Sequence, residues 1–253
     1  MDRVVADERA GSTPAGPLSR ALRAAAPHTW FLEDEVAGLA EHVRPGAVCL
    51  DVGAEYGLYT WTLAGLVGST GHVHAVEPQP GPSSFVDTTR RFLRADNVTV
   101  HRTALGAATG GGVLALPRRR LLPVHGRAFL TTGADGLGSN AEFARHEDVP
   151  VAVTTVDDLV AGLGLERLDL VKVDIEGAEA HLLRGAGATL AAFRPVLMLE
   201  LEDRHLARFG TSVARVVAEL ATDGYVARTW DRDRGWTPRR ADDGRRNVLF
   251  VPR

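Results

Sequence analysis

The stretch LDVGAEYGLYT, residues 50 to 60, is typical of a strand that runs into a glycine turn and then a helix. Gly53 and Gly57 let the backbone of such a turn approach a ligand, because no Cβ stands in the way. The following helix presents free backbone N–H groups. The glycine spacing is GxxxG and differs from the GxGxxG of dinucleotide-binding turns. The stretch therefore predicts an α/β fold with a nucleotide-like ligand at the end of its first strand.

Two carboxylates narrow the class of ligand. Asp51 ends the first strand, where it favours the ammonium of an amino acid moiety over a pyrophosphate. Glu77 ends the second strand, some 24 residues after Gly53, where an acid accepts ribose hydroxyls. The turn itself contains no lysine or arginine that would meet a phosphate. These features predict a nucleoside with a zwitterionic tail, and S-adenosylmethionine fits that description.

Strands and helices alternate along most of the chain, which indicates a parallel sheet covered on both faces. We expect strands at 47–52, 72–77, 98–102, 168–173 and 195–201, and a closing hairpin from 225–229 and 247–251. We expect helices at 18–26, 33–42, 58–67, 81–95, 156–163, 178–191 and 212–223.

The regular pattern is interrupted between residues 104 and 153. This stretch is rich in glycine, and only 113–116, 127–131 and 149–155 have the composition of short strands. A long irregular insertion in a regular fold is more often functional than structural. We expect residues 107–148 to shape a substrate pocket within one domain, 29–253, that follows an N-terminal arm and short helix, 1–28.

Composition excludes several classes of protein. The formal net charge of −3 gives no basic field for nucleic acid, and the lone Cys49 allows no internal disulfide and no cysteine zinc cluster. No run approaches the roughly 18 apolar residues of a membrane span. The first residues lack the apolar segment of a secretory signal. We expect a cytoplasmic protein that does not bind a membrane.

A second motif, VKVDIEGAE at 171–179, also ends a strand in an acid, Asp174. Glu200 ends the next strand, VLMLE. Ligands of parallel sheets lie at the carboxyl ends of the strands. Asp51, Glu77, Asp174 and Glu200 should therefore converge on one edge of the sheet. The acids that follow Asp174, and Glu179 above all, are also explained by a helix that prefers acidic residues in its first turn.

From about residue 30 to 253 the chain resembles the FkbM-type S-adenosylmethionine-dependent methyltransferases. The most specific part is DLVKVDIEGAEAHLLRGAGATLAAFRPVLMLELE (169–202), preceded by TTVDDL (154–159). LDVGAEYGLYT, VEP (76–78), AL-G (104–106) and NVLFVP (247–252) match in order. The resemblance implies a Rossmann-like class I fold: a mostly parallel sheet of seven strands in the order 3-2-1-4-5-7-6, with helices on both faces and the last strand antiparallel. It also implies methylation of hydroxyl groups, often on sugars or polyketides.

Carried over residue by residue, the resemblance assigns Asp51, Gly53 and Gly57 to the cofactor turn and Glu77 to the ribose. Asp174 lies where the family brings an acid near the reacting end of the cofactor and the acceptor. Position 55 departs from the family, which usually has asparagine where this chain has Glu55. The residues expected to bind the cofactor are Asp51, Gly53, Ala54, Glu55, Tyr56, Gly57, Thr60, Glu77, Pro78, Ala104 and Asp174.

Methyl transfer to a hydroxyl needs alignment and removal of a proton. The candidate bases are Asp174, Glu200, His205 and His146, the last of which lies in the insertion. Asp174 and Glu200, with Glu202 or Asp203, also offer oxygen ligands to Mg²⁺. We favour the reading without a metal, because the same carboxylates serve as base and as hydrogen-bond acceptors.

Other functions remain open at this stage. A nicotinamide-dependent oxidoreductase is disfavoured by GxxxG and Asp51, and a non-catalytic cofactor-binding module by the acids at 174 and 200. The arginine pairs and triplet at 118–120, 239–240 and 245–246 suit a solvated face better than an RNA groove. The expected partner is a small-molecule acceptor. The oligomeric state is left open, a homodimer included.

Overall fold

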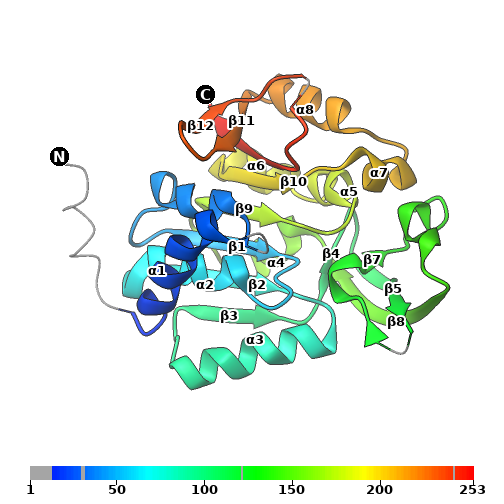
Figure 1. The fold of residues 1–253 in the computed structure, drawn as a ribbon, viewed down its shortest axis with the longest axis horizontal. Helices are drawn as coiled ribbons and strands as arrows, with labels where there is room; N and C mark the ends of the chain where they lie inside the picture. Colours follow the sequence, from blue (N-terminus) through cyan, green and yellow to red (C-terminus); the bar gives the residue numbers. More distant parts are fainter. Residues whose placement is uncertain (1–12, 30–31, 121, 242) are drawn as a thin grey trace.

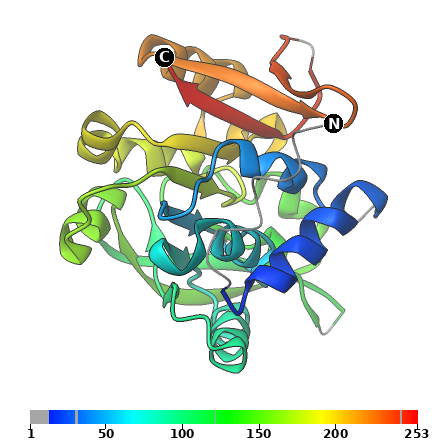
Figure 2. The ribbon, with the colours of Figure 1, turned by 90° about the vertical axis from the view of Figure 1, so that its left-hand side faces the viewer.

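The computed structural model describes residues 13–29, 32–120, 122–241 and 243–253. The first twelve residues of the expected arm lie outside these ranges. The described part of that region forms helix α1 (Gly16–Ala25) and the short turn η2 (Ala26–His28). Helix α1 packs against α2 (Leu58–Val67), on the side that faces the viewer in Figure 2.

An eight-stranded sheet forms the centre of the molecule (Figure 1). Its order is β12-β11-β13-β10-β9-β1-β2-β3. The neighbouring strands β10, β9, β1, β2 and β3 pair in parallel, whereas β13 is antiparallel to both β10 and β11. The bounds are β1 Val48–Val52, β2 His72–Val76, β3 Val98–His101, β9 Leu170–Val173, β10 Val196–Glu200, β11 Tyr225–Asp231, β12 Gly235–Pro238 and β13 Asn247–Pro252.

The expected count of seven strands is wrong by one edge strand. The segments expected as a closing hairpin, β11 and β13, do pair, but β12 lies in the loop between them and pairs with β11. The pairing places Trp230 opposite Trp236, whose rings meet edge to face at 5.3 Å. A cross-strand aromatic pair of this kind stabilises a short antiparallel ribbon.

Alternation along the central strands builds a core on each face of the sheet. Cys49 points into one core and Leu50 into the other, as period-two alternation requires. The first core is covered by α1, α2, η3 (Asp34–Glu41) and α3 (Pro80–Leu93). The second is covered by α4 (Val156–Leu163), α5 (Glu179–Arg184), α6 (Gly187–Phe193) and α8 (Val213–Thr222).

Two expected helices differ from the prediction. The segment 33–42 is a 3₁₀ helix, η3, and the segment 178–191 is divided into α5 and α6. The division falls at Gly185, where a Cβ would lie 2.2 Å from the carbonyl oxygen of Gly106. The close approach of another backbone therefore requires a glycine there and interrupts the helix. By contrast, α2 and α4 have the bounds that the sequence predicts.

The stretch expected to be irregular forms a second sheet beside the first, drawn in green in Figure 1. Its long strands, β5 (Gly110–Arg119) and β8 (Arg145–Thr154), pair antiparallel over nine residues from Gly110↔Val153 to Arg118↔Arg145. The strand expected at 113–116 lies within β5, but strand propensity misses both ends of β5, because it begins with three glycines and contains Pro117. The short strands are β4 Ala104–Leu105, β6 Leu122–Pro123 and β7 Phe129–Leu130, with turns η5 His125–Arg127 and η6 Gly138–Glu142.

Among the described residues, every helix is too short or too polar to cross a lipid bilayer.

Candidate functional site

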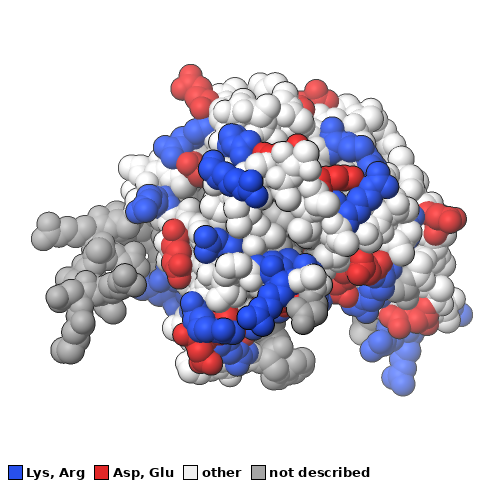
Figure 3. Space-filling model, turned by 90° about the horizontal axis from the view of Figure 1, so that it is seen from above, with Lys and Arg blue, Asp and Glu red and all other residues white. Residues whose placement is uncertain are grey.

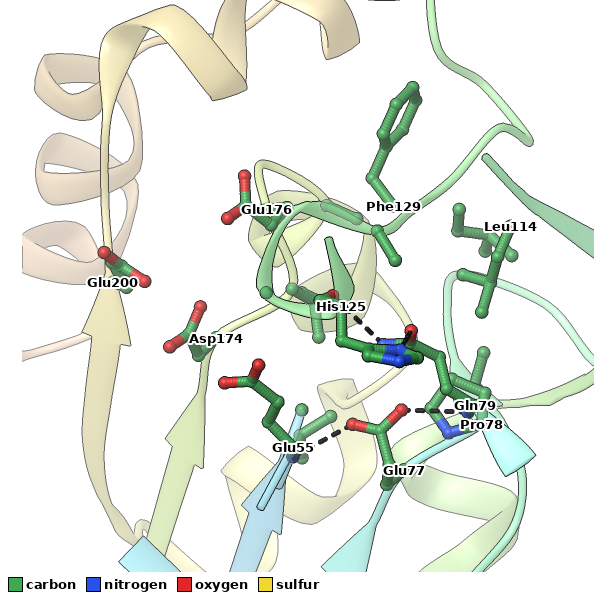
Figure 4. Close-up of a pocket in the computed structure, with 18 of the residues that line it drawn as sticks. Glu55, Glu77, Pro78, Gln79, Leu114, His125, Phe129, Asp174, Glu176 and Glu200 are labelled. Carbon is green, nitrogen blue, oxygen red and sulfur yellow. Dashed lines mark hydrogen bonds between the residues drawn. The ribbon is translucent and has the colours of Figure 1, made fainter. Parts of the chain in front are cut away.

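A cavity of about 290 Å³ opens at the carboxyl ends of β1, β2, β9 and β10. The second sheet closes it from the opposite side (Figure 4). The carboxylates of Glu55, Asp174, Glu176 and Glu200 lie on one side of the cavity, and Leu114 and Phe129 lie on the other. This is the edge on which the strand-end acids were expected to converge, and Glu77, Asp174 and Glu200 do line it.

Packing within the protein explains both glycines of the turn after β1. Gly53 has φ +77°, and a Cβ there would lie 1.9 Å from the carbonyl oxygen of Asp174. Gly57 has φ +90°, and a Cβ there would lie 2.5 Å from Nε1 of Trp61. Side chains are therefore excluded by the β9 turn and by α2, not only by a ligand. Gly53 also lines the cavity, whereas Gly57 does not.

Asp51 joins strand β1 to helix α2. Its side chain is buried and accepts a hydrogen bond from the Thr60 hydroxyl at 2.5 Å. Burial raises the pKa of Asp51 to about 6, although the Thr60 hydrogen bond and Lys172 act in the opposite direction. Neither residue lines the cavity. The pair joins the turn after β1 to helix α2.

The other residues expected in the turn divide between the cavity and its surroundings. Glu55 lines the cavity, whereas Ala54 and Tyr56 do not. Tyr56 is 46% exposed and packs edge to face with Phe85 and with the His125 ring at 5.4 and 6.1 Å. Glu55 has φ +44°, a conformation that costs energy for a residue with a Cβ.

Glu77 is fixed by two backbone amides at the end of β2. Its Oε2 accepts a hydrogen bond from the amide of Glu55 at 3.0 Å, and its Oε1 accepts one from the amide of Gln79 at 2.8 Å. Burial raises the pKa of Glu77 to about 7. Pro78 and Ala104, which were also expected at the cofactor, line the cavity beside it.

Asp174 and Glu200 end the neighbouring strands β9 and β10 and share a hydrogen bond. Burial, followed by the charge of Asp174, raises the pKa of Glu200 to about 10. Burial also acts to raise the pKa of Asp174, but Lys172 and the hydrogen bond from Glu200 outweigh it and lower that pKa. The two carboxyl groups therefore titrate as a coupled pair, in which Lys172 favours the ionised form of Asp174 and burial favours the protonated form of Glu200, although Arg246 lies 2.8 Å from Oε1 of Glu200.

Glu176 lines the cavity, whereas its position in the sequence was also consistent with a helix terminus. Its φ is +56°, and its Oε2 lies 3.0 Å from Nδ1 of His205 and 3.7 Å from Nε of Arg127. A charged residue held in this backbone region is more frequent at functional sites than elsewhere. The helix-terminus role belongs to Glu179, whose Oε1 accepts the amides of Ile175 and Gly177.

The two histidines proposed as bases lie outside the lining of the cavity. His205 is buried behind Glu176 and contacts the site only through that residue. His146 is on β8, and its Nε2 lies 3.1 Å from the carbonyl oxygen of Asn140.

The second sheet supplies cavity residues that sequence patterns did not identify. Turn η5 crosses the opening, and its His125 is joined to Gln79 by two contacts: Nδ1 to Oε1 at 2.7 Å, and the Gln79 Nε2 donating to the His125 carbonyl at 3.2 Å. The apolar wall is made by Leu114, Phe129 and Leu130. No local motif marks these residues, because β5 and β7 bring them together only after pairing.

Acidic residues outnumber basic ones in the cavity lining. Six carboxyl groups line it, against three guanidinium groups, although burial raises the pKa of Glu77 to about 7 and that of Glu200 to about 10. Glu55, Glu77 and Glu33 among them suit a ligand with positive charge and hydroxyl groups, as S-adenosylmethionine has. The groups of His, Cys, Asp and Glu within the described ranges include no cluster of three with the geometry to hold a metal ion.

Several arginines outside the cavity pair with acids. Arg118 meets Glu147, and Arg245 meets Asp231 and Asp243. Figure 3 shows acidic and basic side chains interspersed on the face seen from above. Such a face is a solvated surface rather than a groove of one sign.

The fold and the site define a methyltransferase-like α/β protein, and comparison with known proteins identifies the family. The model of the methyltransferase FkbM domain matches residues 51–227. The chain belongs to this family. No curated protein matches the sequence.

Solved structures show the likeness in fold. A methyltransferase FkbM from Methylobacillus flagellatus KT is similar with a TM-score of 0.51 and 16% identity, over 92% of this chain and 58% of that one. The chain thus spans little more than half the length of that protein. An O-methyltransferase from Bacillus cereus, solved with SAH, is similar with a TM-score of 0.47 and 14% identity, over 100% of this chain and 96% of that one.

Proposed function

We propose that this protein transfers the methyl group of S-adenosylmethionine to a hydroxyl group of a small molecule. The observation that carries the proposal is the excess of carboxylates in a cavity at the strand ends, with Glu77 presented by two backbone amides. S-adenosylmethionine, when bound, supplies an electrophilic methyl group on a positively charged sulfonium.

Glu77, Pro78 and Ala104 would hold the nucleoside part. Glu77 has free lone pairs for the ribose hydroxyls, because each oxygen accepts only one of the two backbone amides. Glu33 and Glu55, which line the same cavity, would face the ammonium. Asp51, given as an ammonium partner on the basis of its position in the sequence, would act instead by holding α2 through Thr60.

Asp174 would orient the acceptor hydroxyl and take its proton. A hydroxyl becomes strongly acidic as its oxygen bonds to the incoming carbon, so an ionised carboxylate is sufficient as a late proton acceptor. Glu200, whose pKa is raised by burial and by Asp174, would carry the proton of the pair and donate its hydrogen bond to Asp174. The proton then passes from Asp174 to solvent.

The acceptor would lie between the carboxylates and the apolar wall of the second sheet. A molecule that has both hydroxyl groups and an apolar face, such as a sugar-bearing or polyketide-type natural product, suits Leu114 and Phe129 on one side and Asp174 and Glu176 on the other. The mixed charge of the face in Figure 3 supports a small molecule over a nucleic acid. We propose that the reaction takes place in the cytoplasm.

Calorimetric titration tests the cofactor before any acceptor is known. S-adenosylhomocysteine should bind to the purified protein and bind at least tenfold more weakly to Glu77→Ala, and NAD⁺ should not bind. Thr62→Val, a substitution away from the cavity, is the control and should bind as the unaltered protein does. Binding of NAD⁺ in place of S-adenosylhomocysteine would overturn the proposal in favour of an oxidoreductase. Binding without turnover on any of a panel of hydroxylated acceptors would favour a non-catalytic module.

A further inference from the structure

Lys172 is the only lysine of a chain that carries 29 lysines and arginines in total. Every other cationic side chain of this kind is an arginine. Lys172 is on β9, two residues before Asp174, and its side chain is fully buried. An unpaired buried ammonium is strongly unfavourable, so the surroundings of this one group must compensate for its burial.

Three groups surround the ammonium. Nζ lies 3.6 Å from Oδ2 of Asp174, 3.5 Å from Oδ1 of Asn247 and 4.6 Å from the centre of the Tyr59 ring. The first is an ion pair, the second a hydrogen bond, and the third a cation–π contact, which is strongest where water is excluded. An ammonium has three donors and an arginine has five, so this set of partners satisfies a lysine and would leave an arginine unsatisfied.

Charged groups from several elements face this position. Burial alone lowers the pKa of a lysine, but here the carboxylates outweigh it and raise the pKa of Lys172 above its ordinary value. The ammonium is therefore positively charged at neutral pH. The titratable and charged groups that face it are Glu33 and Glu35 before β1, Asp51 on β1, Tyr59 on α2, Asp174 after β9, and Glu200 on β10, with Arg246 beyond Glu200.

The surrounding geometry fixes the ammonium on the side of Asp174. The hydroxyl of Tyr59 bonds Glu33 and lies 3.3 Å from Oε1 of Glu35, which fixes the ring whose face meets Nζ. Asn247 is on β13, opposite Glu200 in the β10–β13 pairing, and contacts Lys172 from the far side of β10. The ammonium lies beside Asp174, which lines the cavity, whereas Lys172 itself does not.

We propose that Lys172 is a positioning residue that keeps Asp174 ionised and leaves the single proton of the Asp174–Glu200 pair on Glu200. The role assigned to Asp174 as proton acceptor rests on the proposed function, whereas the charge state of the trio does not. Without the ammonium, Asp174 would lose its nearest counter-ion, and the proton of the pair would no longer have a preferred carboxyl group.

The single lysine makes a direct test possible. Protein labelled with ¹³Cε-lysine gives one lysine side-chain signal, and an Arg253→Lys variant adds an exposed reference lysine at the C-terminus. In a titration by NMR, the Lys172 signal should remain that of the ammonium at the pH where the reference, near its ordinary pKa of about 10.4, is half deprotonated. In Asp174→Asn, the Lys172 midpoint should fall toward or below the reference. A Lys172 midpoint at or below the reference in the unaltered protein, or no change in Asp174→Asn, would overturn the proposal.

Kinetics give a second readout once an acceptor is known. In Lys172→Met, the acid limb of kcat should move to higher pH, because Asp174 is then protonated more readily. The loss of kcat at neutral pH should be about tenfold or more, and it should recover in part as the pH rises, with little change in KM for S-adenosylmethionine. A kcat that falls equally at every pH would show a merely structural role. Absence of methyl transfer in the unaltered protein would contradict the proposed function and leave the NMR result to decide the charge state.

Discussion

The carboxylate of Glu77 accepts the backbone amide of Glu55 at 3.0 Å and thereby joins the end of β2 to the turn after β1. This bond fixes the turn in the conformation that gives Glu55 its positive φ and directs its side chain into the cavity. One acid is thus held in a strained backbone by another, and both lie where a cationic ligand would bind. The arrangement has consequences for stability that can be measured separately from binding.

Replacement of Glu55 by asparagine should stabilise the protein and weaken the cofactor. Asparagine tolerates positive φ better than glutamate does. The change also removes the Glu55 carboxyl group, whose pKa is raised by burial and by Asp174 and Glu176. We expect a gain of about 1 kcal/mol in the free energy of unfolding by urea at pH 8. By calorimetry, Glu55→Asn should bind S-adenosylmethionine more weakly than the unaltered protein does. The loss should be smaller for S-adenosylhomocysteine, whose sulfur is uncharged. Lower stability in Glu55→Asn would contradict this account.

Gly53→Ala should severely destabilise the fold. The new Cβ would lie 1.9 Å from the carbonyl oxygen of Asp174, and φ there is +77°. Backbone cannot move aside as a flexible side chain does, so a loss of roughly 3 kcal/mol or more is expected. Gly187→Ala is the matched control, because nothing lies within 4 Å of its added Cβ and it begins helix α6. Thermal unfolding that is the same in both variants would refute the packing explanation.

Thr60→Val should destabilise the protein in a manner that depends on pH. The change removes the hydroxyl that donates to buried Asp51, whose folded pKa is about 6. At pH 8 Asp51 is ionised and the loss should be about 2 kcal/mol, whereas at pH 5 it is mostly protonated and the loss should be smaller. The control is Thr62→Val, whose hydroxyl donates to the Leu58 carbonyl and involves no charge. Urea unfolding at the two pH values should show equal losses for the control only.

His74 should make the fold sensitive to mild acid. Burial, with help from His72 and His101, lowers its folded pKa from 6.5 to about 4. The unfolded chain therefore binds the proton first, so stability is complete above pH 6.5 and is lost as the pH falls toward 4. Between pH 7 and 5 the free energy of unfolding should fall by roughly 2 kcal/mol more in the unaltered protein than in His74→Gln.

Exposed His28 provides the control for that experiment. His28→Gln should follow the unaltered protein across the same pH range. An equal fall of stability in His74→Gln and in the unaltered protein would assign the acid sensitivity to other groups.

Local patterns predict the parts of the molecule that depend on neighbours in the chain. Helix α2 has the predicted bounds because its start follows Gly57 and most of its residues are apolar. Glu77, Asp174 and Glu200 lie at one edge because strands in a parallel sheet end together. The missed features depend on residues far apart in sequence. The break at Gly185 reflects the Gly106 carbonyl, and the cavity position of Phe129 reflects its pairing with Ala115.

Asp51 shows that sequence position does not predict the partner of a side chain. Its place at the end of β1 was predicted, but the orientation of its side chain toward Thr60 is set by the depth at which α2 packs on the sheet. Sequence position gives the strand and the residue type, whereas the partner is decided by packing. The same holds for His205, which contacts Glu176 instead of the cavity.

The pairing of Gly110 with Val153 means that the second sheet leaves the main fold and returns to it at nearly one point. The segment between these residues supplies Leu114, His125, Arg127 and Phe129 to the cavity, yet none of the carboxylates at the strand ends of the main sheet. Evolution could therefore exchange this segment as a unit, and alter the range of acceptors, while the half that holds the cofactor is inherited unchanged. The same junction is where an engineer would graft a segment from another member of the family.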